Sequence, residues 1–128
     1  MSLKSYSFSK EEHLKRKKEI SRVFKDGIFL YEKHLSVVFI PSDEEGQKLH
    51  RVAVSVPKKY FKRAVDRNRI KRQLRECYRL NKSCLYLQEL TFSLNLMFVY
   101  ISNSMIPYSS INEEIISLLK RVLKKLSD

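Results

Sequence analysis

One stretch of the sequence limits the possible folds most strongly, because it predicts a helix with an apolar face and a cationic face side by side. Residues 66–79 read DRNRIKRQLRECYR, and six of these fourteen positions are Arg or Lys. At about 100° per residue, the apolar side chains of the stretch fall within one arc of roughly 100°. They are Ile70, Leu74, Cys77 and Tyr78. We therefore predict a helix from Arg63 or Asp66 to Leu80, with this face packed on the rest of the protein.

A stripe of cations lies directly beside the apolar one. By the same geometry, an arc of roughly 140° holds one amide and most of the basic side chains. Its members are Arg67, Asn68, Lys71, Arg72, Arg75 and Arg79. Like charges one turn apart cost roughly 0.2–0.5 kcal/mol per pair, and solvated helix faces usually mix signs. We interpret the stripe as a polyanion-binding surface, in which the many Arg side chains favour forked contacts with phosphate oxygens.

The charge of the whole chain is concentrated around this helix. The 128 residues include 26 basic and 14 acidic ones, a net charge of +12 that attracts nucleic acid, anionic membranes or acidic proteins. Residues 58–82 hold eleven of the basic residues and two of the acidic ones. A membrane is disfavoured because a surface-lying helix needs a free apolar side, whereas this apolar stripe is needed for the core. The longest uncharged stretch, 90–112, has an apolar part of about 12 residues, too short to span a bilayer.

The remaining chemistry-bearing residues indicate a cytoplasmic protein without a metal site. The N-terminus MSLKSYSFSKEEHLKRKK has no apolar signal segment. Cys77 and Cys84 are expected to be reduced and partly buried, since seven helical residues separate their Cα atoms by roughly 10 Å, too far for a disulfide. The three His residues are scattered and no second Cys pair is present, so we expect no metal site.

Periodicity predicts the element order α-β-β-α-β-α in a single two-layer α+β domain. A helix is expected from Lys17, closed by Gly27. Strands are expected at 34–40 and 51–56, joined as an antiparallel hairpin, and at 94–101, a nearly all-apolar and therefore central strand. The basic helix would cross over between the second and third strands, which makes these two parallel. The last helix is expected over 111–126, with Glu113 and Glu114 as its N-terminal charges.

The same residues carry a family resemblance. RVAVSVPKKYFKRAVDRNRIKRQLRECYRL strongly resembles the protein subunit of bacterial ribonuclease P. Arg67-Asn68-Arg69 matches the family's helix signature, and Lys58-Lys59 stand where the family has its basic pair. The segment HLKRKKEISRVFKDG is similar to the family's opening. The resemblance covers about residues 13–127, and its last third matches only in pattern.

The resemblance implies a role in tRNA maturation. The family's enzyme is an endonuclease that removes the 5′ leader from precursor tRNA. Its RNA subunit performs the chemistry with Mg²⁺, and the protein, which holds no cofactor, helps to bind the substrate. The expected partners are ribonuclease P RNA and the leader, with no DNA. The length of the chain is that of one domain, so we expect a single RNA-binding domain over 1–128, with 1–12 as a flexible segment. The resemblance also implies a left-handed β-α-β crossover, against the general preference for right-handed ones.

Site residues are carried over by position. The residues expected to bind ribonuclease P RNA are Arg67, Asn68, Arg69, Lys71, Arg72, Arg75 and Arg79. Those expected at the leader, in a cleft between the first helix and the sheet, are Phe24, Lys17, Lys58, Lys59 and Tyr60. Phe24 matches the family's leader-contacting aromatic but is equally consistent with a core position, and Ile20 replaces a second aromatic one turn earlier. Of Tyr60 and Phe61, we expect one to be in the core. Either face of the strand at 34–40 could line the cleft.

Three other functions remain as alternatives. A ribosomal or other structural RNA-binding protein would share the charge, size and fold type, although the ordered Lys-Lys and Arg-Asn-Arg signature argues against it. A DNA-binding domain would need a helix-turn-helix partner or a dimer zipper. A stand-alone protein nuclease would need convergent carboxylates for two Mg²⁺ ions, which the acidic clusters at 11–12, 43–45 and 113–114 do not indicate.

Overall fold

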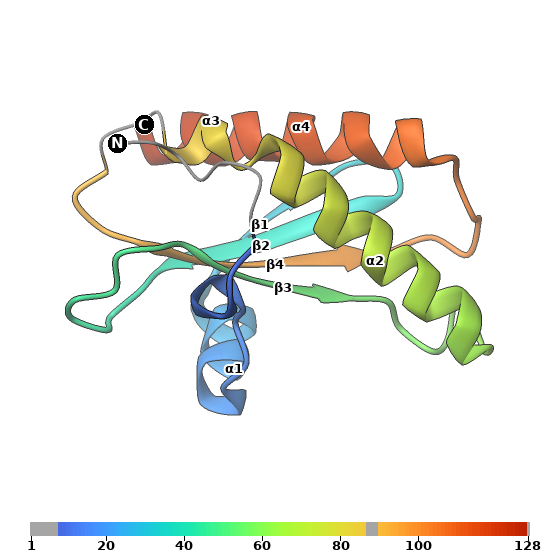
Figure 1. Cartoon of the computed structure of the whole chain (residues 1–128), viewed down its shortest axis with the longest axis horizontal. Coiled ribbons are helices and arrows are strands. Elements are labelled where there is room, and N and C mark those ends of the chain that lie inside the picture. The colour runs from blue at the N-terminus through green and yellow to red at the C-terminus, as the bar shows by residue number, and fades with distance from the viewer. Residues whose placement is uncertain (1–7, 87–89, 128) are drawn as a thin grey trace.

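A computed structural model describes residues 8–86 and 90–127 and contains a four-stranded sheet with helices on both faces (Figure 1). The elements follow one another as η1 (Lys10–Glu12, a 3₁₀ turn), α1 (Lys17–Asp26), β1 (Ile28–Tyr31), β2 (Leu35–Pro41), β3 (Arg51–Ser55), α2 (Ala64–Asn81), α3 (Ser83–Tyr86), β4 (Leu94–Tyr100) and α4 (Tyr108–Ser127). The α+β class is confirmed. Three elements were not predicted: the 3₁₀ turn η1, the strand β1 and the short helix α3.

The sheet has the strand order β1-β2-β4-β3. The predicted hairpin between β2 and β3 is wrong, because β4 lies between them and pairs antiparallel with β2 and parallel with β3. The hairpin is instead β1–β2, in which Phe29 lies opposite Val38 and Tyr31 opposite Ser36. The predictions of a parallel pair across the basic helix and of a central last strand are both confirmed. The left-handed crossover stays a prediction.

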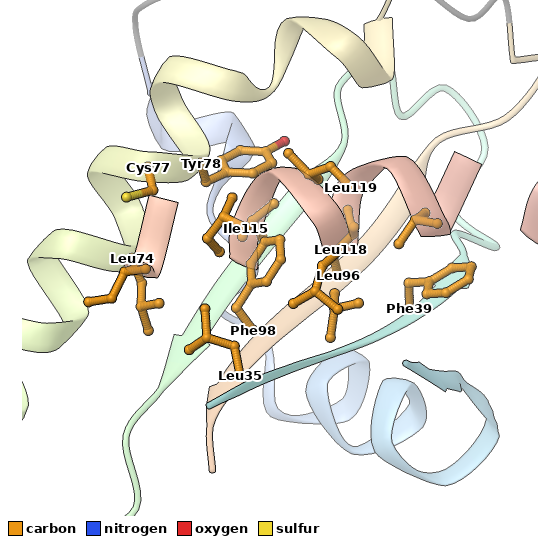
Figure 2. Packing of buried hydrophobic residues seen from close by; sticks show 14 of the residues in the cluster. Leu35, Phe39, Leu74, Cys77, Tyr78, Leu96, Phe98, Ile115, Leu118 and Leu119 are labelled. Atoms are coloured by element: carbon orange, nitrogen blue, oxygen red, sulfur yellow. The ribbon is translucent and has the colours of Figure 1, made fainter. Parts of the chain in front are cut away.

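The main core lies between the sheet and the helices α2 and α4 (Figure 2). Alternate residues of the strands point to this side, among them Phe39 of β2 and Leu96 and Phe98 of β4, all fully buried. They meet Leu74 and Tyr78 of α2 and the apolar stripe of α4. The members of that stripe are Ile111, Ile115, Leu118, Leu119 and Val122. The apolar face predicted for the basic helix is therefore confirmed.

The opposite face of the sheet carries α1 and a smaller apolar cluster (Figure 1). Val23 of α1 packs with Leu14, Val38 and Met97, and Ile20 contacts the rim of this cluster. The face of β2 toward α1 therefore consists of Ser36, Val38 and Ile40, the other residues of the strand being turned to the main core.

Gly27 is required where α1 meets the sheet, but for space and not for a left-handed backbone. Its φ is −76°, and its N–H donates to the carbonyl of Val23 at 2.9 Å. An added Cβ would lie 2.3 Å from that carbonyl oxygen and 2.7 Å from Cγ2 of Val38. Gly46, with φ of 82°, is the glycine that serves a turn conformation.

The segment before α1 is tied to the domain from Phe8 onward, in contrast to the flexible segment expected for residues 1–12. Glu12 accepts hydrogen bonds from the Ser9 N–H at 3.1 Å, which is one of the two contacts of a capping box, and from the Ser9 hydroxyl at 3.3 Å. The same carboxylate forms a buried ion pair with Nζ of Lys82, at 2.6 Å and 2.8 Å. His13 then bridges to Val52 of β3. Residues 1–7 lie outside the described part of the chain.

Other polar predictions had mixed outcomes. Glu114 does more than supply a helix N-terminal charge: it accepts from the N–H groups of His34 and Leu35 at 2.8 Å and 3.0 Å, and contacts Nδ1 of His34, so it holds the β1–β2 turn. Cys77 is buried, Cys84 is half-buried, and both are free thiols, as expected. No helix in the described ranges combines the length and apolarity needed to cross a membrane.

Candidate nucleic-acid interface

Helix α2 presents its cations on the side away from the core. It begins at Ala64, within the predicted start, and its buried side chains face β3, β4 and α4. Asn68, Arg69, Arg72 and Arg75 are exposed, and Lys71 is half-buried. In residues 8–86 and 90–127, none of these four cations takes part in an ion pair. The helix therefore offers rigidly mounted, unneutralised cations to an external anion.

Two of the predicted RNA-binding residues are engaged within the protein itself. The guanidinium of Arg67 donates to the carbonyls of Phe61 and Lys62, at 2.9 Å and 2.8 Å, and so fixes the loop before α2. Arg79 forms an ion pair with Glu76 on the same helix, and the hydrogen bond raises the pKa of Arg79. Arg67 and Arg79 thus stand at the two ends of the series of cations on α2, and both are held by contacts within the protein.

The segment that precedes α1 lies alongside this basic face. Burial lowers the pKa of His13, and the charges of Lys15 and Arg75 lower it further. The ring of His13 stacks on Phe8 with centroids 4.0 Å apart. The positive field of Arg75 therefore reaches His13, in the segment that precedes α1.

In the loop between β3 and α2, one aromatic residue faces the core and the other faces solvent, as predicted. Phe61 turns inward and meets Tyr100 edge-on at 5.6 Å, so it is the core member. Tyr60 is half-buried, and Nζ of Lys59 lies 5.0 Å from its ring centroid. Lys58 and Lys59 are exposed. A flat ring and two cations thus face solvent together at the end of β3, a combination suited to single-stranded nucleic acid.

Phe24 lies at the surface and not in the core. It is 40% exposed on the last turn of α1, and its ring centroid is 6.3 Å from that of Phe29 on β1. Lys17 lies seven residues earlier, on the same side of the helix and exposed. Ile20 contacts the sheet cluster instead, so it takes part in docking α1.

The predicted leader residues form two groups and not one cluster. Lys17 and Phe24 lie on α1, and Phe24 faces the edge strand β1, whereas Lys58–Tyr60 follow β3 at the opposite edge. Three strand spacings separate the two edges, about 14 Å. A ligand that touches both groups must run across the α1 side of the sheet.

Sequence reasoning missed the exposed aromatics of β1. Phe29 and Tyr31 are 38% and 58% exposed, and their rings are nearly parallel with centroids 6.2 Å apart. The signal was present in the run IFLY after Gly27, which is rich in aromatic and β-branched residues. It was overlooked because four residues are too few to display a clear alternation.

Most acidic groups near these surfaces are committed to structural contacts. Glu19 and Glu44 both pair with Arg51, and Glu32 pairs with Arg121. Across the described residues, no three His, Cys, Asp or Glu side chains are grouped so that they could hold a metal ion. With these carboxylates paired, the exposed cations are left available to an external anion.

Comparison with known proteins identifies close relatives. Residues 8–124 match the family model described as Ribonuclease P. The chain is 35% identical over 120 residues to the ribonuclease P protein component of Porphyromonas gingivalis, covering 92% of this chain and 88% of the relative. It is 32% identical over 127 residues to that of Petrotoga mobilis, covering 94% and 98%.

Solved structures agree on the fold. The ribonuclease P protein of Staphylococcus aureus superposes with a TM-score of 0.70 at 22% identity, covering 87% of this chain and 94% of that one. The protein from Thermotoga maritima gives 0.69 at 23% identity, covering 86% and 96%. The arrangement of sheet and helices is therefore the one found in these two proteins.

Proposed function

The chain belongs to the ribonuclease P protein family, and on that premise we propose that it assists a catalytic RNA in removing the 5′ leader from precursor tRNA. It is the protein component of an endonuclease whose chemistry is performed by the RNA subunit. The observation that carries the proposal is the set of exposed, unneutralised cations on α2, in a chain matched by the family model over 8–124. The free thiols of Cys77 and Cys84 are in keeping with a cytoplasmic location.

Helix α2 is proposed to bind the ribonuclease P RNA. Phosphate contacts position an RNA-binding protein, and they are best made by Arg or Lys held on a rigid element. Arg69, Lys71, Arg72 and Arg75 meet this condition, with Asn68 as a neutral donor and acceptor among them. Arg67 and Arg79 are proposed to contribute charge from positions that their internal hydrogen bonds fix.

The α1 side of the sheet is proposed to bind the leader. Unpaired bases stack on flat side chains, while the backbone follows cations. Phe24 with Lys17 and Tyr60 with Lys58 and Lys59 supply such pairs at the two edges of the sheet. Mg²⁺ is assigned to the RNA-catalysed reaction, with none held by the protein.

The test is cleavage of a 5′-extended precursor tRNA at low Mg²⁺ by a bacterial ribonuclease P RNA, with and without the protein. A strong gain only when both are present is expected. Arg72→Ala should weaken RNA binding and reduce its salt slope by about 0.7–0.9. Lys124→Ala, an exposed cation at the far end of α4, is the matched control and should change neither.

Two outcomes would overturn the proposal. RNA binding without any gain in cleavage would indicate a structural RNA-binding protein. Cleavage by the protein alone, without an RNA subunit, would indicate a protein nuclease.

A further inference from the structure

Three exposed aromatic rings lie in a row on the α1 side of the sheet. They belong to Phe24, Phe29 and Tyr31, and we call them the aromatic row. Their centroids are 6.3 Å apart for the first pair and 6.2 Å for the second. Between 38% and 58% of each residue is exposed to water. Three neighbouring rings left open to this degree form a surface that an aromatic or planar ligand could cover.

The strand β1 is built so that this row is separate from the main core. Leu30 points to the other side of the sheet and packs with the core beneath α4. Phe29 and Tyr31 lie opposite Val38 and Ser36, on the α1 side. The edge strand is thus anchored by one residue, while its two aromatic rings continue the surface that begins at Phe24.

Cations flank the row. Lys17 lies within about 20° of Phe24 around α1, Lys25 is the next residue after Phe24, and Lys33 is in the turn after Tyr31; all three are exposed. The nearby carboxylate of Glu32 is paired with Arg121 at 2.6 Å, and Arg121 also donates to the Tyr31 carbonyl. Asp26 falls on the opposite side of α1, about 160° from Phe24.

The exposed rings and the flanking cations together indicate which kind of ligand fits this surface. Flat rings among cations that form no ion pair within residues 8–86 and 90–127 suit a flexible polyanion with planar groups, which is single-stranded nucleic acid. A second copy of this chain fits less well, because it would bring the same lysines and a net charge of +12 to the same surface.

We propose that Phe29 and Tyr31 extend the leader-binding surface to the edge strand and stack on unpaired leader bases far from the cleavage site. The inference rests on the proposed function. Lys58–Tyr60 directly precede α2, the helix proposed to bind the catalytic RNA, so the end of the leader next to the cleavage site is assigned to this edge of the sheet. A leader that crosses the sheet from there reaches Phe24 first and the two β1 rings afterwards. Long leaders therefore use these rings, and very short leaders do not reach them.

The experiment measures equilibrium binding of precursor tRNA to the reconstituted holoenzyme. Two substrates are compared, one with a leader of a single nucleotide and one with a leader of about ten nucleotides, a length within the site sizes of single-strand-binding domains. Tyr31→Leu and the double variant Phe29→Leu/Tyr31→Leu keep apolar cover on the sheet but lose flat rings. We expect the double variant to bind the long-leader substrate roughly 10-fold more weakly, with no change for the short one. Tyr31→Phe should restore wild-type binding.

The matched control is Phe92→Leu, which changes an aromatic of equal exposure in the loop before β4. It should leave both affinities unchanged. Thermal unfolding of each variant checks that the fold is retained, and the Tyr31→Leu and Tyr31→Phe pair keeps the test valid if the double variant is unstable.

The inference would be overturned if the Tyr31→Leu holoenzyme bound the long-leader substrate as tightly as the wild type does. It would also be overturned if the variant bound both substrates more weakly by the same factor. A wild-type dimer that Tyr31→Leu converts to a monomer would assign the row to a second copy. If wild-type protein gives no gain with either leader, the proposed function itself fails, which is distinguishable from failure of the inference alone.

Discussion

On the side of the sheet covered by α2 and α4, Phe39, Phe98 and Tyr100 are fully buried, whereas on the side covered by α1 the rings of Phe24, Phe29 and Tyr31 remain between 38% and 58% exposed. The same residue types thus have opposite environments across one layer of backbone. The difference follows from the length of the covering helices. Helices α2 and α4 have 18 and 20 residues, and α1 has 10.

At 1.5 Å per residue, α1 is about 15 Å long, against about 27 Å and 30 Å for α2 and α4. One short helix cannot cover a four-stranded sheet, so part of its α1 side stays open. The buried contacts that stabilise the fold are therefore concentrated on the side of α2 and α4, which leaves the α1 side available for a ligand. We therefore expect substitutions on the α2 and α4 side to lower the free energy of unfolding much more than substitutions on the α1 side.

The largest expected effect tests this separation with one residue type. Phe98→Ala removes a fully buried ring from the central strand and should lower the free energy of unfolding by about 3–5 kcal/mol. Phe24→Ala removes a ring that is already 40% exposed and should cost less than about 1 kcal/mol. Urea unfolding of both variants gives the comparison. Similar losses would show that the α1 side is as important for stability as the main core.

The second prediction concerns the pH dependence of stability, which we expect to depend on the buried residue His50. Burial lowers the pKa of His50 to about 4, and its Nδ1 accepts from the Leu94 N–H at 2.9 Å while its ring contacts Tyr86 of α3. Below pH 6.5 the unfolded chain binds a proton that the folded chain accepts only near pH 4. Stability should therefore fall as the pH falls through this window, by up to about 3 kcal/mol from this group.

The measurement is urea unfolding between pH 7 and pH 4, with His50→Asn as the control. The Asn carboxamide oxygen can take the place of the Nδ1 acceptor but does not titrate. The variant should show a correspondingly shallower fall. An unchanged pH dependence in His50→Asn would assign the loss to other groups.

The smallest expected effect concerns α2, which contacts the core on one face and is proposed to bind RNA on the other. Arg67→Ala removes two hydrogen bonds to loop carbonyls at a partly exposed site and should cost about 1 kcal/mol of stability. Arg72→Ala should cost less than about 0.5 kcal/mol, because Arg72 is exposed and has no ion pair within the described chain. Thermal unfolding beside RNA titration measures both. A stability loss in Arg72→Ala equal to that in Arg67→Ala would contradict the division of roles.

Local patterns were sufficient for the three long helices α1, α2 and α4. The start of α1 at Lys17 and of α2 near Arg63 follow from apolar spacing, and α4 begins at Tyr108, three residues before the prediction, directly after Pro107. Gly27 was placed correctly as the end of α1, although the reason for a glycine there is the nearby sheet, which sequence does not display.

Strand pairing could not be predicted from the sequence in the same way. Neighbouring strands joined by a short polar turn usually pair, so β2 and β3 were expected to form a hairpin. The nearly all-apolar β4, 39 residues after the end of β3 by chain position, pairs with both instead. Likewise, the internal contacts of Arg67 depend on the path of the loop at 58–63, which no periodicity specifies.

The central place of β4 has a consequence for how the protein is made. Strands β2 and β3 emerge from the ribosome well before residue 94, yet β3 has no strand to pair with until β4 has been synthesised. Pairings between distant segments form slowly, and nascent chains expose apolar surface while they wait. Helix α2 also lacks β4 and α4, on which it buries its apolar stripe. The cationic face of α2, which we propose binds RNA, is therefore held in place only once most of the chain has been translated, so recognition of the proposed partner follows synthesis.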